Sequence, residues 1–356
     1  MYFLNDYDYD LPASFIAQKP LAPRDRSRLL YLDANSGRMS HHGFHQLPEL
    51  LLPTDLLVIN NTEVVPGRLT GTKDTGGKAE VLMLDFAALT ACPSEQGSGV
   101  CPCLIKASKP PRPGTVIIFN ERVKGVVLSG RDGLFRVKFI WEGDLSGELY
   151  QIGETPLPPY IKRTGIPGAD RDSYQTVYAS QKGAIAAPTA GFHFSENLLD
   201  RIRSKGIQIA EITLHVGLGT FFPVRAEDIR QHRMHSEKFV IAEKAADMIR
   251  RARKERRRIV AVGTTCVRTL EHAFGDDDTV YPGAGCCDLF IYPGYRFKVV
   301  DAMVTNFHLP KSTLLMLVAA FAGREQILQA YAEAKNSGYR FYSYGDAMLI
   351  ASSEKK

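Results

Sequence analysis

The sequence lacks a long apolar run and a recognisable leader. Its longest apolar candidate, residues 314–322, is far shorter than the roughly 20 residues that a membrane-spanning helix needs. The first ten residues contain neither a basic segment nor the apolar core of a secretory leader. We therefore expect a soluble protein that stays in the cytoplasm.

Paired cysteines and a dinucleotide-binding loop are absent as well. The six cysteines form no C-x-x-C pair, so we expect free thiols and no metal site; they are Cys92, Cys101, Cys103, Cys266, Cys286 and Cys287. The segment G-L-G-T at residues 217–220 lacks the third glycine and the following helix of a G-x-G-x-x-G fingerprint. These absences argue against a zinc finger and against a Rossmann-type dinucleotide site.

The composition is that of a globular protein. The chain has 356 residues, 44% of them hydrophobic and 23% charged, which suits one large domain or two modest ones. The net charge of +5 is compatible with a nucleic-acid partner but does not require one, because many metabolic enzymes carry a similar charge. Composition alone leaves both an enzyme and an RNA-binding protein open.

The pattern of apolar residues divides the chain into three zones. The first ends near Asn61, after a predicted strand at residues 55–59. In the second, alternating runs such as Phe135, Val137 and Phe139 predict a small barrel or sandwich, with a loose loop at residues 91–100. The first zone is too small to fold alone. We therefore predict an α/β catalytic domain of residues 1–61 and 151–356, interrupted by a β-barrel of residues 62–150.

From about residue 153 the chain alternates strands with helices, which predicts the α/β domain. The expected strands are residues 184–187, 211–216, 258–262 and 299–305, and the expected helices are residues 196–205, 242–256, 266–273 and 312–322. Ser195 is the expected N-cap of the first of these helices, and Gly206 is its expected C-terminal stop.

Three histidines follow predicted strands of this domain. His193 lies in the loop after the first strand, His215 ends the second, and His308 lies in the loop after the last. Ligands of open α/β sheets bind at the carboxyl ends of the strands, so we expect these imidazoles to converge on one pocket and transfer protons. A zinc site is the weaker alternative, since neither characteristic spacing nor an acidic partner accompanies them.

Small, hydroxyl and basic residues near the same loops indicate a substrate-binding surface. The residues expected to bind substrate are Thr189, Gly191, Gly217, Gly219, Thr264, Thr265, Arg268 and Lys311. Glycines let the backbone approach a ligand closely, and the free N–H groups at a helix start can hold a carboxylate or a phosphate. An ordinary capped helix with an ion pair explains Thr264, Thr265 and Arg268 equally well.

Two basic segments are candidates for contact with nucleic acid. The first mixes cations with aromatic rings, which suits phosphates and unstacked bases; it comprises Tyr160, Lys162, Arg163, Arg171 and Tyr174. The second, R-A-R-K-E-R-R-R at residues 251–258, is denser, but a solvated helix end is its simpler interpretation.

A set of sequence blocks is more specific than any single motif. The blocks are Y-D-L-P (9–12), R-D-R-S-R-L-L (24–30), L-L-V-I-N-N-T (56–62), P-L-P-P-Y-I-K-R (156–163), Y-Q-T-V-Y-A (174–179), A-A-P-T-A-G-F-H-F (186–194), L-H-V-G-L-G-T-F (214–221), M-H-S-E (234–237), L-F-I-Y-P-G-Y (289–295), T-N-F-H-L-P-K-S (305–312) and Y-G-D-A-M-L-I (344–350). They span nearly the whole chain and resemble the S-adenosylmethionine:tRNA ribosyltransferase-isomerase family of queuosine biosynthesis.

This resemblance implies a two-domain fold, with a β-barrel inserted in an α/β domain. It implies that S-adenosylmethionine is a consumed substrate, with no further cofactor, and gives its ribosyl group to the aminomethyl group of a 7-deazaguanine at the wobble position of tRNA. The products are epoxyqueuosine-tRNA, adenine and methionine. We expect a monomer. The chain departs from the family pattern at Ser173, Cys266 and Cys287, where the family usually has Arg, Ser and Thr.

The implied chemistry gives the candidate residues roles. The ribose carbon beside the sulfonium loses a proton, adenine leaves more easily when protonated, and the acceptor amine must lose protons to attack. We expect the three histidines to share these transfers. Arg268 and Lys311 would hold the methionine carboxylate, and Thr189 and Thr265 would position the donor.

Two other classes of protein stay open. An RNA-binding protein without catalysis would explain the basic charge but not the histidine and glycine loops. A small-molecule transferase or isomerase would explain the α/β site but would leave Lys162, Arg163 and the barrel without a role. Release of adenine only in the presence of precursor-bearing tRNA would separate the three classes.

Overall fold

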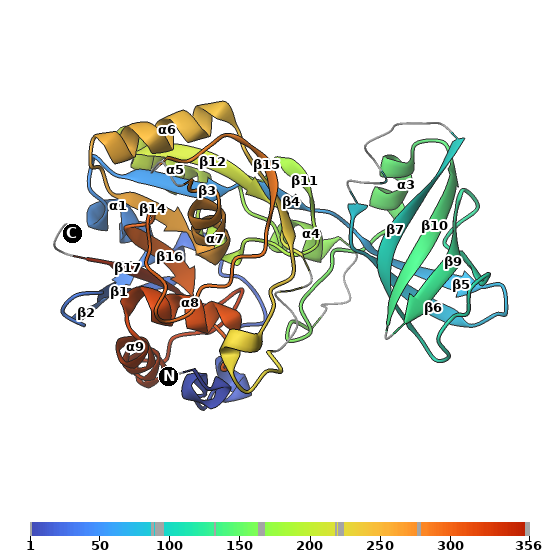
Figure 1. Cartoon of the computed structure of the whole chain (residues 1–356), viewed down its shortest axis with the longest axis horizontal. Coiled ribbons are helices and arrows are strands. Elements are labelled where there is room, and N and C mark those ends of the chain that lie inside the picture. Colours follow the sequence, from blue (N-terminus) through green and yellow to red (C-terminus); the bar gives the residue numbers. More distant parts are fainter. Residues whose placement is uncertain are drawn as a thin grey trace.

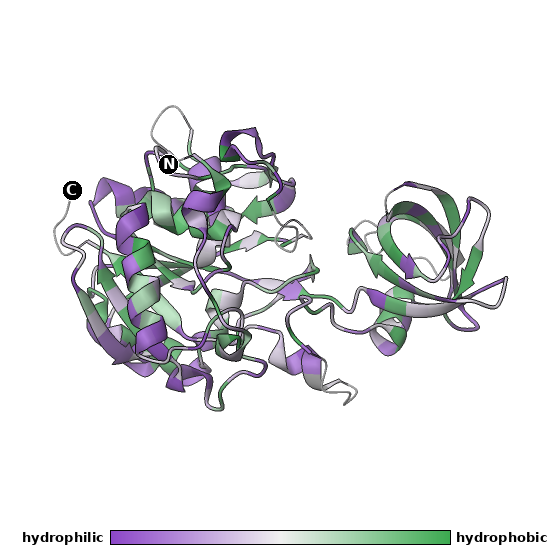
Figure 2. Ribbon diagram, turned by 90° about the horizontal axis from the view of Figure 1, so that it is seen from below, coloured by the Kyte–Doolittle hydropathy of each residue, from purple (hydrophilic) through white to green (hydrophobic). Residues whose placement is uncertain are grey.

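The computed structural model contains two bodies joined by a narrow connection of extended chain (Figure 1; Figure 2). It describes residues 2–86, 89, 96–131, 133–162, 168–217, 219, 224–275 and 279–352. The larger body holds both ends of the chain (Figure 1). The smaller body is therefore an insertion between two parts of the larger one.

A mixed sheet forms the centre of the larger body. In the described part of the chain its nine strands are, in spatial order, β15 (Gly283–Cys287), β13 (Glu237–Ile241), β12 (Gln208–Leu214), β3 (Leu56–Asn60), β14 (Ile259–Val262), β16 (Ala302–Asn306), β17 (Ala347–Ala351), β1 (Arg28–Asp33) and β2 (Met39–Gly43). The strands from β12 to β16 run parallel, whereas β17 is antiparallel to β16 and parallel to β1.

One edge of this sheet, which we call the loop edge, collects chain segments running in both directions. The parallel strands β12, β3, β14 and β16 finish there, at Leu214, Asn60, Val262 and Asn306. Because β17 is antiparallel to β16, with Ala347 opposite Asn306, the starts of β17 and β1 lie at the same edge. Loops adjoining six strands can therefore meet in one place.

Helices cover both faces of the sheet, because its central strands are apolar on both sides. One face packs against α6 (Glu243–Lys254), α7 (Gly263–His272), α8 (Thr313–Ala322) and α9 (Arg324–Asn336), and the other packs against α1 (Leu47–Leu50) and α5 (Glu196–Ser204). The helices predicted from the sequence are confirmed, with ends shifted by a few residues. Within the described ranges, no helix is both long and apolar enough to cross a membrane.

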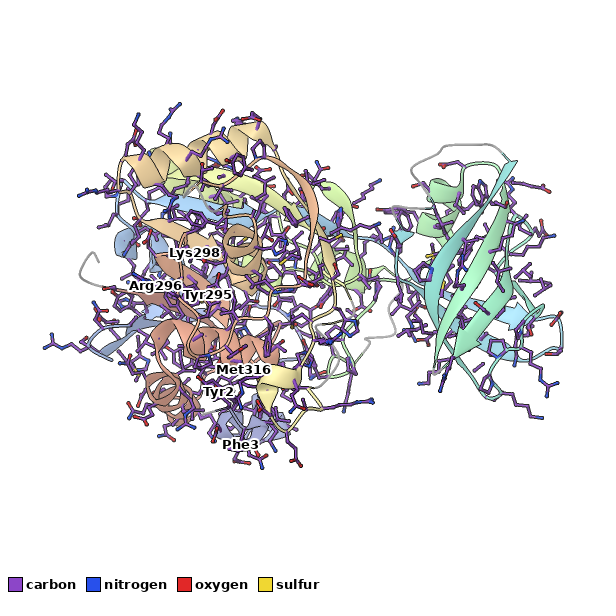
Figure 3. All side chains as sticks on the ribbon, viewed as in Figure 1. Tyr2, Phe3, Tyr295, Arg296, Lys298 and Met316 are labelled. Carbon is purple, nitrogen blue, oxygen red and sulfur yellow. The ribbon has the colours of Figure 1, made fainter. Side chains whose placement is uncertain are left out.

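Short elements complete the larger body. They are η1 (Leu4–Tyr7), η2 (Ala13–Phe15), η3 (Arg24–Arg26), η4 (Phe44–Gln46), α4 (Ala169–Ser173), η5 (Thr189–His193), η7 (Ile229–Gln231) and a two-stranded sheet of β4 (Thr62–Val64) and β11 (Gln181–Ala184). The chain start packs back onto this body. Figure 3 shows Tyr2 and Phe3 at its rim, where the Tyr2 ring meets the Tyr292 ring edge-on at 6.2 Å.

The smaller body is a closed antiparallel barrel. Its strands, in spatial order, are β10 (Leu134–Glu142), β7 (Gln96–Ala107), β6 (Lys78–Met83), β5 (Arg68–Lys73), β8 (Val116–Ile118) and β9 (Val123–Arg131), followed in the chain by α3 (Leu145–Ile152). Phe135, Val137 and Phe139 fill the barrel core while Arg136 is exposed, as the alternating pattern predicts. The predicted fold class is confirmed, and the domain boundaries at 61/62 and 150/151 stay a prediction.

Two local predictions were wrong. Residues 96–100 belong to the long strand β7 and not to a loop, because β10 supplies hydrogen-bonding partners along their whole length; residues 91–95 lie outside the described residues. The strand predicted at residues 184–187 is β11, which ends at Ala184 and pairs with β4 outside the large sheet. Pro188 has no N–H to donate to a ladder, and alanine is a weak strand former.

The N-cap of α5 offers a test of this local structure. The Ser195 hydroxyl accepts a hydrogen bond from the Leu198 N–H (3.2 Å) and donates one to Asp25 (2.8 Å), as expected for the predicted cap. Ser195→Ala should lower the free energy of unfolding by about 1 kcal/mol, measured by urea denaturation. Ser204→Ala, at the exposed end of the same helix, should change it by less than about 0.5 kcal/mol. Equal effects of the two substitutions would contradict the cap.

Candidate active site

A cavity opens at the loop edge of the large sheet. It holds about 560 Å³ of empty space, part of it open to solvent. Its walls come from segments far apart in the sequence: η5 gives Thr189, the start of α7 gives Thr264 and Thr265, and the end of β16 and its loop give Asn306 and His308. Loops from separate parts of the chain therefore meet at this edge.

The start of α7 presents its backbone to the cavity. Val262 is the N-cap residue and has no side-chain group to accept from the first N–H groups of this helix. Gly263 takes a left-handed conformation (φ +85°), which favours glycine at this turn. The N–H groups of the first turn are thus available to a hydrogen-bond acceptor on a ligand.

His308 is the histidine that lines the cavity. Its backbone N–H donates to the Tyr331 hydroxyl (2.9 Å), and its Nε2 lies 3.2 Å from the Thr305 hydroxyl oxygen. Burial lowers the pKa of His308 to about 3, so its imidazole is neutral at pH 7. A neutral imidazole has one ring nitrogen that donates a hydrogen bond and one that accepts. Because the ring is uncharged at neutral pH, it carries no extra proton to release.

His193 lies behind the cavity wall and is held by hydrogen bonds at both ring nitrogens. Its Nε2 lies 3.1 Å from the Asn306 amide nitrogen, and its Nδ1 lies 2.7 Å from the Ser27 hydroxyl oxygen. The Asn306 amide nitrogen also donates to the Tyr342 carbonyl (3.1 Å), which can only accept. This contact fixes the amide orientation, so Asn306 donates to Nε2 of His193, and the ring proton must sit on Nδ1 and point at Ser27.

The environment of His193 keeps it uncharged. The side chain is buried, and its ring packs against Phe44 with centroids 5.0 Å apart. Burial lowers the pKa of His193 to about 4. His193 reaches the loop edge through η5 and not from a strand of the large sheet, which corrects the position predicted for it.

His215 stands apart from these two histidines. It is half-buried, and its Nδ1 lies 2.8 Å from the Thr62 hydroxyl oxygen, beside β4 and β11. Gly183 packs against the ring so closely that an added Cβ would lie 2.8 Å from His215. Burial lowers the pKa of His215, and Lys238 lowers it further. It is not among the residues that line the cavity, so the three imidazoles do not share one wall.

Arg268 is turned away from the cavity. Its guanidinium forms a buried ion pair with Glu237 and donates to the Leu289 carbonyl (3.0 Å). The other carboxylate oxygen of Glu237 accepts from the Gly217 N–H (2.9 Å). Arg268 therefore shapes the loop after β12, and its predicted contact with a substrate carboxylate stays a prediction that would require this pair to open.

Other predicted substrate residues also have local partners. Lys311 pairs with Asp8 at 2.9 Å on the surface. Gly191 has no room for a side chain, because an added Cβ would lie 2.1 Å from the Tyr178 hydroxyl. Gly219 is similarly close to His235. Packing alone therefore accounts for these glycines, and nothing in the structure places a ligand against them.

The residues predicted to bind tRNA separate into different environments. Tyr160 and Tyr174 form part of the cavity wall, and the Tyr160 hydroxyl lies 2.8 Å from that of Ser343. Lys162 is exposed, and Arg171 donates to the Tyr150 carbonyl (2.7 Å) where the barrel meets the larger body. Arg163 lies outside the described residues.

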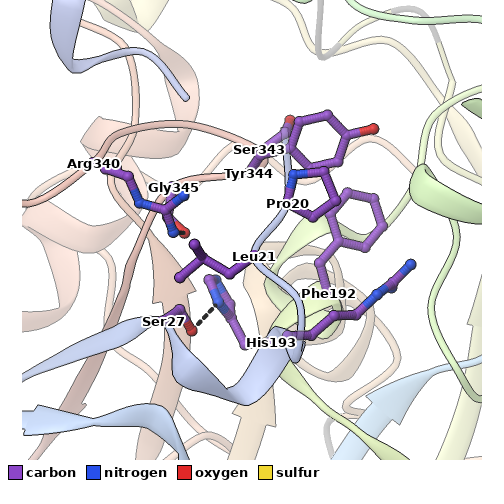
Figure 4. A pocket seen from close by; sticks show the side chains of 10 residues that line it. Pro20, Leu21, Ser27, Phe192, His193, Arg340, Ser343, Tyr344 and Gly345 are labelled. Carbon is purple, nitrogen blue, oxygen red and sulfur yellow. Dashed lines mark hydrogen bonds between the residues drawn. The ribbon is translucent and has the colours of Figure 1, made fainter. Parts of the chain in front are cut away.

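Several polar residues of the site escaped the sequence analysis. A second pocket beside the cavity holds about 200 Å³ of empty space, and Ser27, His193, Arg340 and Ser343 lie around it (Figure 4). Ser343 lines both spaces. Serine and asparagine are common at turns, so single residues of these types do not indicate a binding site. In the sequence, only the block R-D-R-S at residues 24–27 could have indicated this pocket.

The cysteines and acidic residues form no recognisable metal centre. In the described ranges no three His, Cys, Asp or Glu side chains gather as a metal site. Cys101, Cys103, Cys266, Cys286 and Cys287 are free thiols, as predicted, and Cys92 lies outside the described residues. Burial raises the pKa of Cys266, which keeps its thiol protonated at neutral pH.

The low pKa of His193 predicts a dependence of stability on pH. Below about pH 6.5 the unfolded chain binds a proton at this residue that the folded protein does not bind until about pH 4. Its contribution should therefore lower the free energy of unfolding by about 3 kcal/mol as the pH falls from 7 to 4. His193→Gln should lose this part of the pH dependence, measured by urea denaturation across that range. The exposed His45→Gln serves as control, and parallel curves for wild type and His193→Gln would refute the assignment.

Comparison with known proteins identifies the family. The family model described as "Queuosine biosynthesis protein" matches residues 4–350. Proteins named S-adenosylmethionine:tRNA ribosyltransferase-isomerase are similar over their full length: that of Syntrophotalea carbinolica is 49% identical over 348 residues, and that of Symbiobacterium thermophilum is 51% identical over 350 residues, each alignment covering 98% of this chain and 99% of the relative. The crystal structure of S-adenosylmethionine tRNA ribosyltransferase from Thermotoga maritima is 36% identical, with a TM-score of 0.54, over 97% of this chain and 99% of that one. The chain therefore belongs to the queuosine biosynthesis protein family.

Proposed function

We propose that this protein transfers and isomerises the ribosyl group of S-adenosylmethionine onto 7-aminomethyl-7-deazaguanine at the wobble position of tRNA. Epoxyqueuosine-tRNA forms, and adenine and methionine leave. The observation that carries the proposal is the similarity to ribosyltransferase-isomerases of the same length, about half identical from end to end. We expect the enzyme to act in the cytoplasm, where tRNA and S-adenosylmethionine occur, and as a monomer.

The cavity at the loop edge is the proposed site of the donor. It lies at the carboxyl ends of the parallel strands, and the first turn of α7 offers N–H groups to acceptor atoms of a ligand there. Thr189, Thr264 and Thr265 add hydroxyl groups to the wall. We expect no metal ion or further cofactor, with S-adenosylmethionine consumed as a substrate.

The histidines support the proton transfers unequally. His308 lines the cavity and is the imidazole best placed to meet the donor or its leaving adenine. His193 is linked to the cavity wall through Asn306, whose amide nitrogen lies 3.1 Å from Nε2 of His193. His215 lies beside Thr62, outside the cavity wall. We therefore propose His308 as the catalytic histidine to test first, with His193 and His215 in supporting roles.

The tRNA is proposed to approach the loop edge from the side of Lys162. This lysine is exposed and follows Tyr160 and Ile161, which are packed near the cavity. A purely RNA-binding protein would not need a cavity lined by hydroxyl groups. A small-molecule transferase would not need exposed cations at its rim. The ribosyltransferase accounts for both features.

Catalysis can be tested through adenine. Wild-type protein should release adenine from S-adenosylmethionine when tRNA carrying the 7-aminomethyl-7-deazaguanine is present, and should release none with unmodified tRNA. His308→Ala should lower kcat by roughly 100-fold or more, because a positioned proton-transfer group contributes about that much. His45→Ala, on the exposed surface, should retain wild-type kcat. Full activity of His308→Ala would remove this histidine from the mechanism, and adenine release without tRNA would contradict the proposed reaction.

Affinity for tRNA should depend on salt. Each cation that contacts a phosphate adds close to one unit to the slope of log affinity against log salt concentration. Lys162→Gln should therefore weaken tRNA binding and reduce that slope by about 1, measured by fluorescence anisotropy. Lys254→Gln, in the basic run at the far end of α6, should leave the slope unchanged. If Lys254→Gln reduced the slope and Lys162→Gln left it unchanged, the tRNA contact would lie at residues 251–258.

A further inference from the structure

The small pocket beside the cavity adds residues 20–27 to two segments that the donor cavity also uses, η5 and the stretch before β17. Residues 24–27 supply Arg24 and Ser27, η5 supplies His193, and the segment before β17 supplies Arg340 and Ser343. Figure 4 shows Ser27 and His193 on one side of the pocket and Arg340 across from them. The antiparallel direction of β17 brings these segments together, because it places the start of β17 next to the end of β16.

Arg24 forms no hydrogen-bonded ion pair with a carboxylate in the described part of the chain, although the nearby Asp172 carboxylate partly offsets its charge. Its guanidinium is half-buried and donates to the backbone carbonyls of Gln175, Asp172 (2.7 Å) and Ser173 (3.4 Å). A guanidinium has five N–H donors, and these bonds occupy three of them. Burial lowers the pKa of Arg24, which reflects the cost of keeping this cation away from water. An anionic ligand would offset that cost.

Ser27 has a hydrogen-bond donor left over. Its hydroxyl oxygen accepts from Nδ1 of His193, because Asn306 fixes the imidazole with its proton on that nitrogen. The Ser27 hydroxyl hydrogen must therefore point elsewhere, and its residue lines the pocket. The chain of bonds from the Tyr342 carbonyl through Asn306 and His193 thus ends in a donor available to a ligand.

The pocket offers donors and no acidic acceptor. Arg24, Arg340, Ser27 and Ser343 can all donate, although Arg340 is partly neutralised by the buried carboxylate of Asp346 (3.2 Å). No Asp or Glu is among the lining residues. A guanine edge presents N–H donors that need such an acceptor, so a guanine-like base does not fit this lining. A group with acceptors only, an oxyanion, does.

We propose that this pocket is the subsite for the α-carboxylate of S-adenosylmethionine. The inference rests on the proposed function, and it replaces the assignment of the carboxylate to Arg268 and Lys311. Those two cations are already paired with Glu237 and Asp8. The pocket shares Ser343 with the donor cavity, so a donor whose nucleoside occupies the cavity can extend its methionine tail into the pocket. A carboxylate has the acceptor-only chemistry that the pocket requires.

The test compares S-adenosylmethionine with its decarboxylated form, which lacks only this carboxylate. Affinities are measured by titration calorimetry without tRNA, for wild type, Arg24→Gln and Ser27→Ala. Wild type should prefer S-adenosylmethionine on the order of 10- to 100-fold, as hydrogen bonds to a charged group provide. Arg24→Gln should bring this ratio close to 1, and Ser27→Ala should lower it several-fold. Arg26→Gln, in the same short helix but not lining the pocket, should keep the wild-type ratio.

Each outcome supports or overturns the subsite. The ratio compares two ligands on one variant, so a partly destabilised variant still reports it, and Arg24→Lys serves if Arg24→Gln does not fold. An unchanged ratio in both pocket variants overturns the proposal and moves the carboxylate to another donor, such as the start of α7. Weaker tRNA binding with an unchanged ratio would assign the pocket to a tRNA phosphate. Adenine release by the wild type is measured alongside: if it occurs while the ratio is unchanged, only the subsite fails.

Discussion

The side-chain amide of Asn306 is the contact on which the site depends. It ends β16, donates to the Tyr342 carbonyl and to His193, and accepts from the Thr189 hydroxyl (3.3 Å). One buried group thereby joins β16, η5 and the segment before β17. Removing it would leave buried donors or acceptors unpaired, at a cost of about 1–3 kcal/mol each. The same bonds set the proton position on His193 and connect residues that line the cavity with residues that line the smaller pocket.

Buried charge shapes the neighbouring loop in a comparable way. Arg268 and Glu237 are each buried, and their remaining donors and acceptors reach backbone groups, including the Gly217 N–H. Breaking such a pair by removing one partner typically costs about 3–5 kcal/mol, because the other charge is left uncompensated. The pair therefore fixes the backbone at Gly217, just after β12. Arg268 is therefore occupied by Glu237, and a ligand anion needs another cation. Arg24, whose hydrogen bonds go to backbone carbonyls, is the cation that we propose.

The barrel has its own core, and polar contacts around Tyr150 are among those that join it to the larger body. The Tyr150 hydroxyl donates to Glu63 (2.8 Å), the Lys182 ammonium lies 4.6 Å from the ring centroid, and Arg171 donates to the Tyr150 carbonyl. Arg171 thus helps to position the barrel, a role that its place beside Tyr174 in the sequence does not indicate. The two bodies are therefore linked at Arg171 and Lys182, in the segment that precedes the cavity residue Thr189.

The sequence by itself determined the fold class, most helices and strands, and the family, because hydrophobic periodicity, helix caps and sequence blocks are local signals. It also predicted that Thr264, Thr265 and His308 lie at a ligand-binding edge. Only the tertiary structure decided which polar groups are already paired. The sequence left open whether Arg268 is free or paired and did not indicate a partner for Lys311, because Glu237 and Asp8 lie far away along the chain. The pocket of Arg24 and Ser27 was likewise hidden, since it exists only because β17 runs antiparallel to β16.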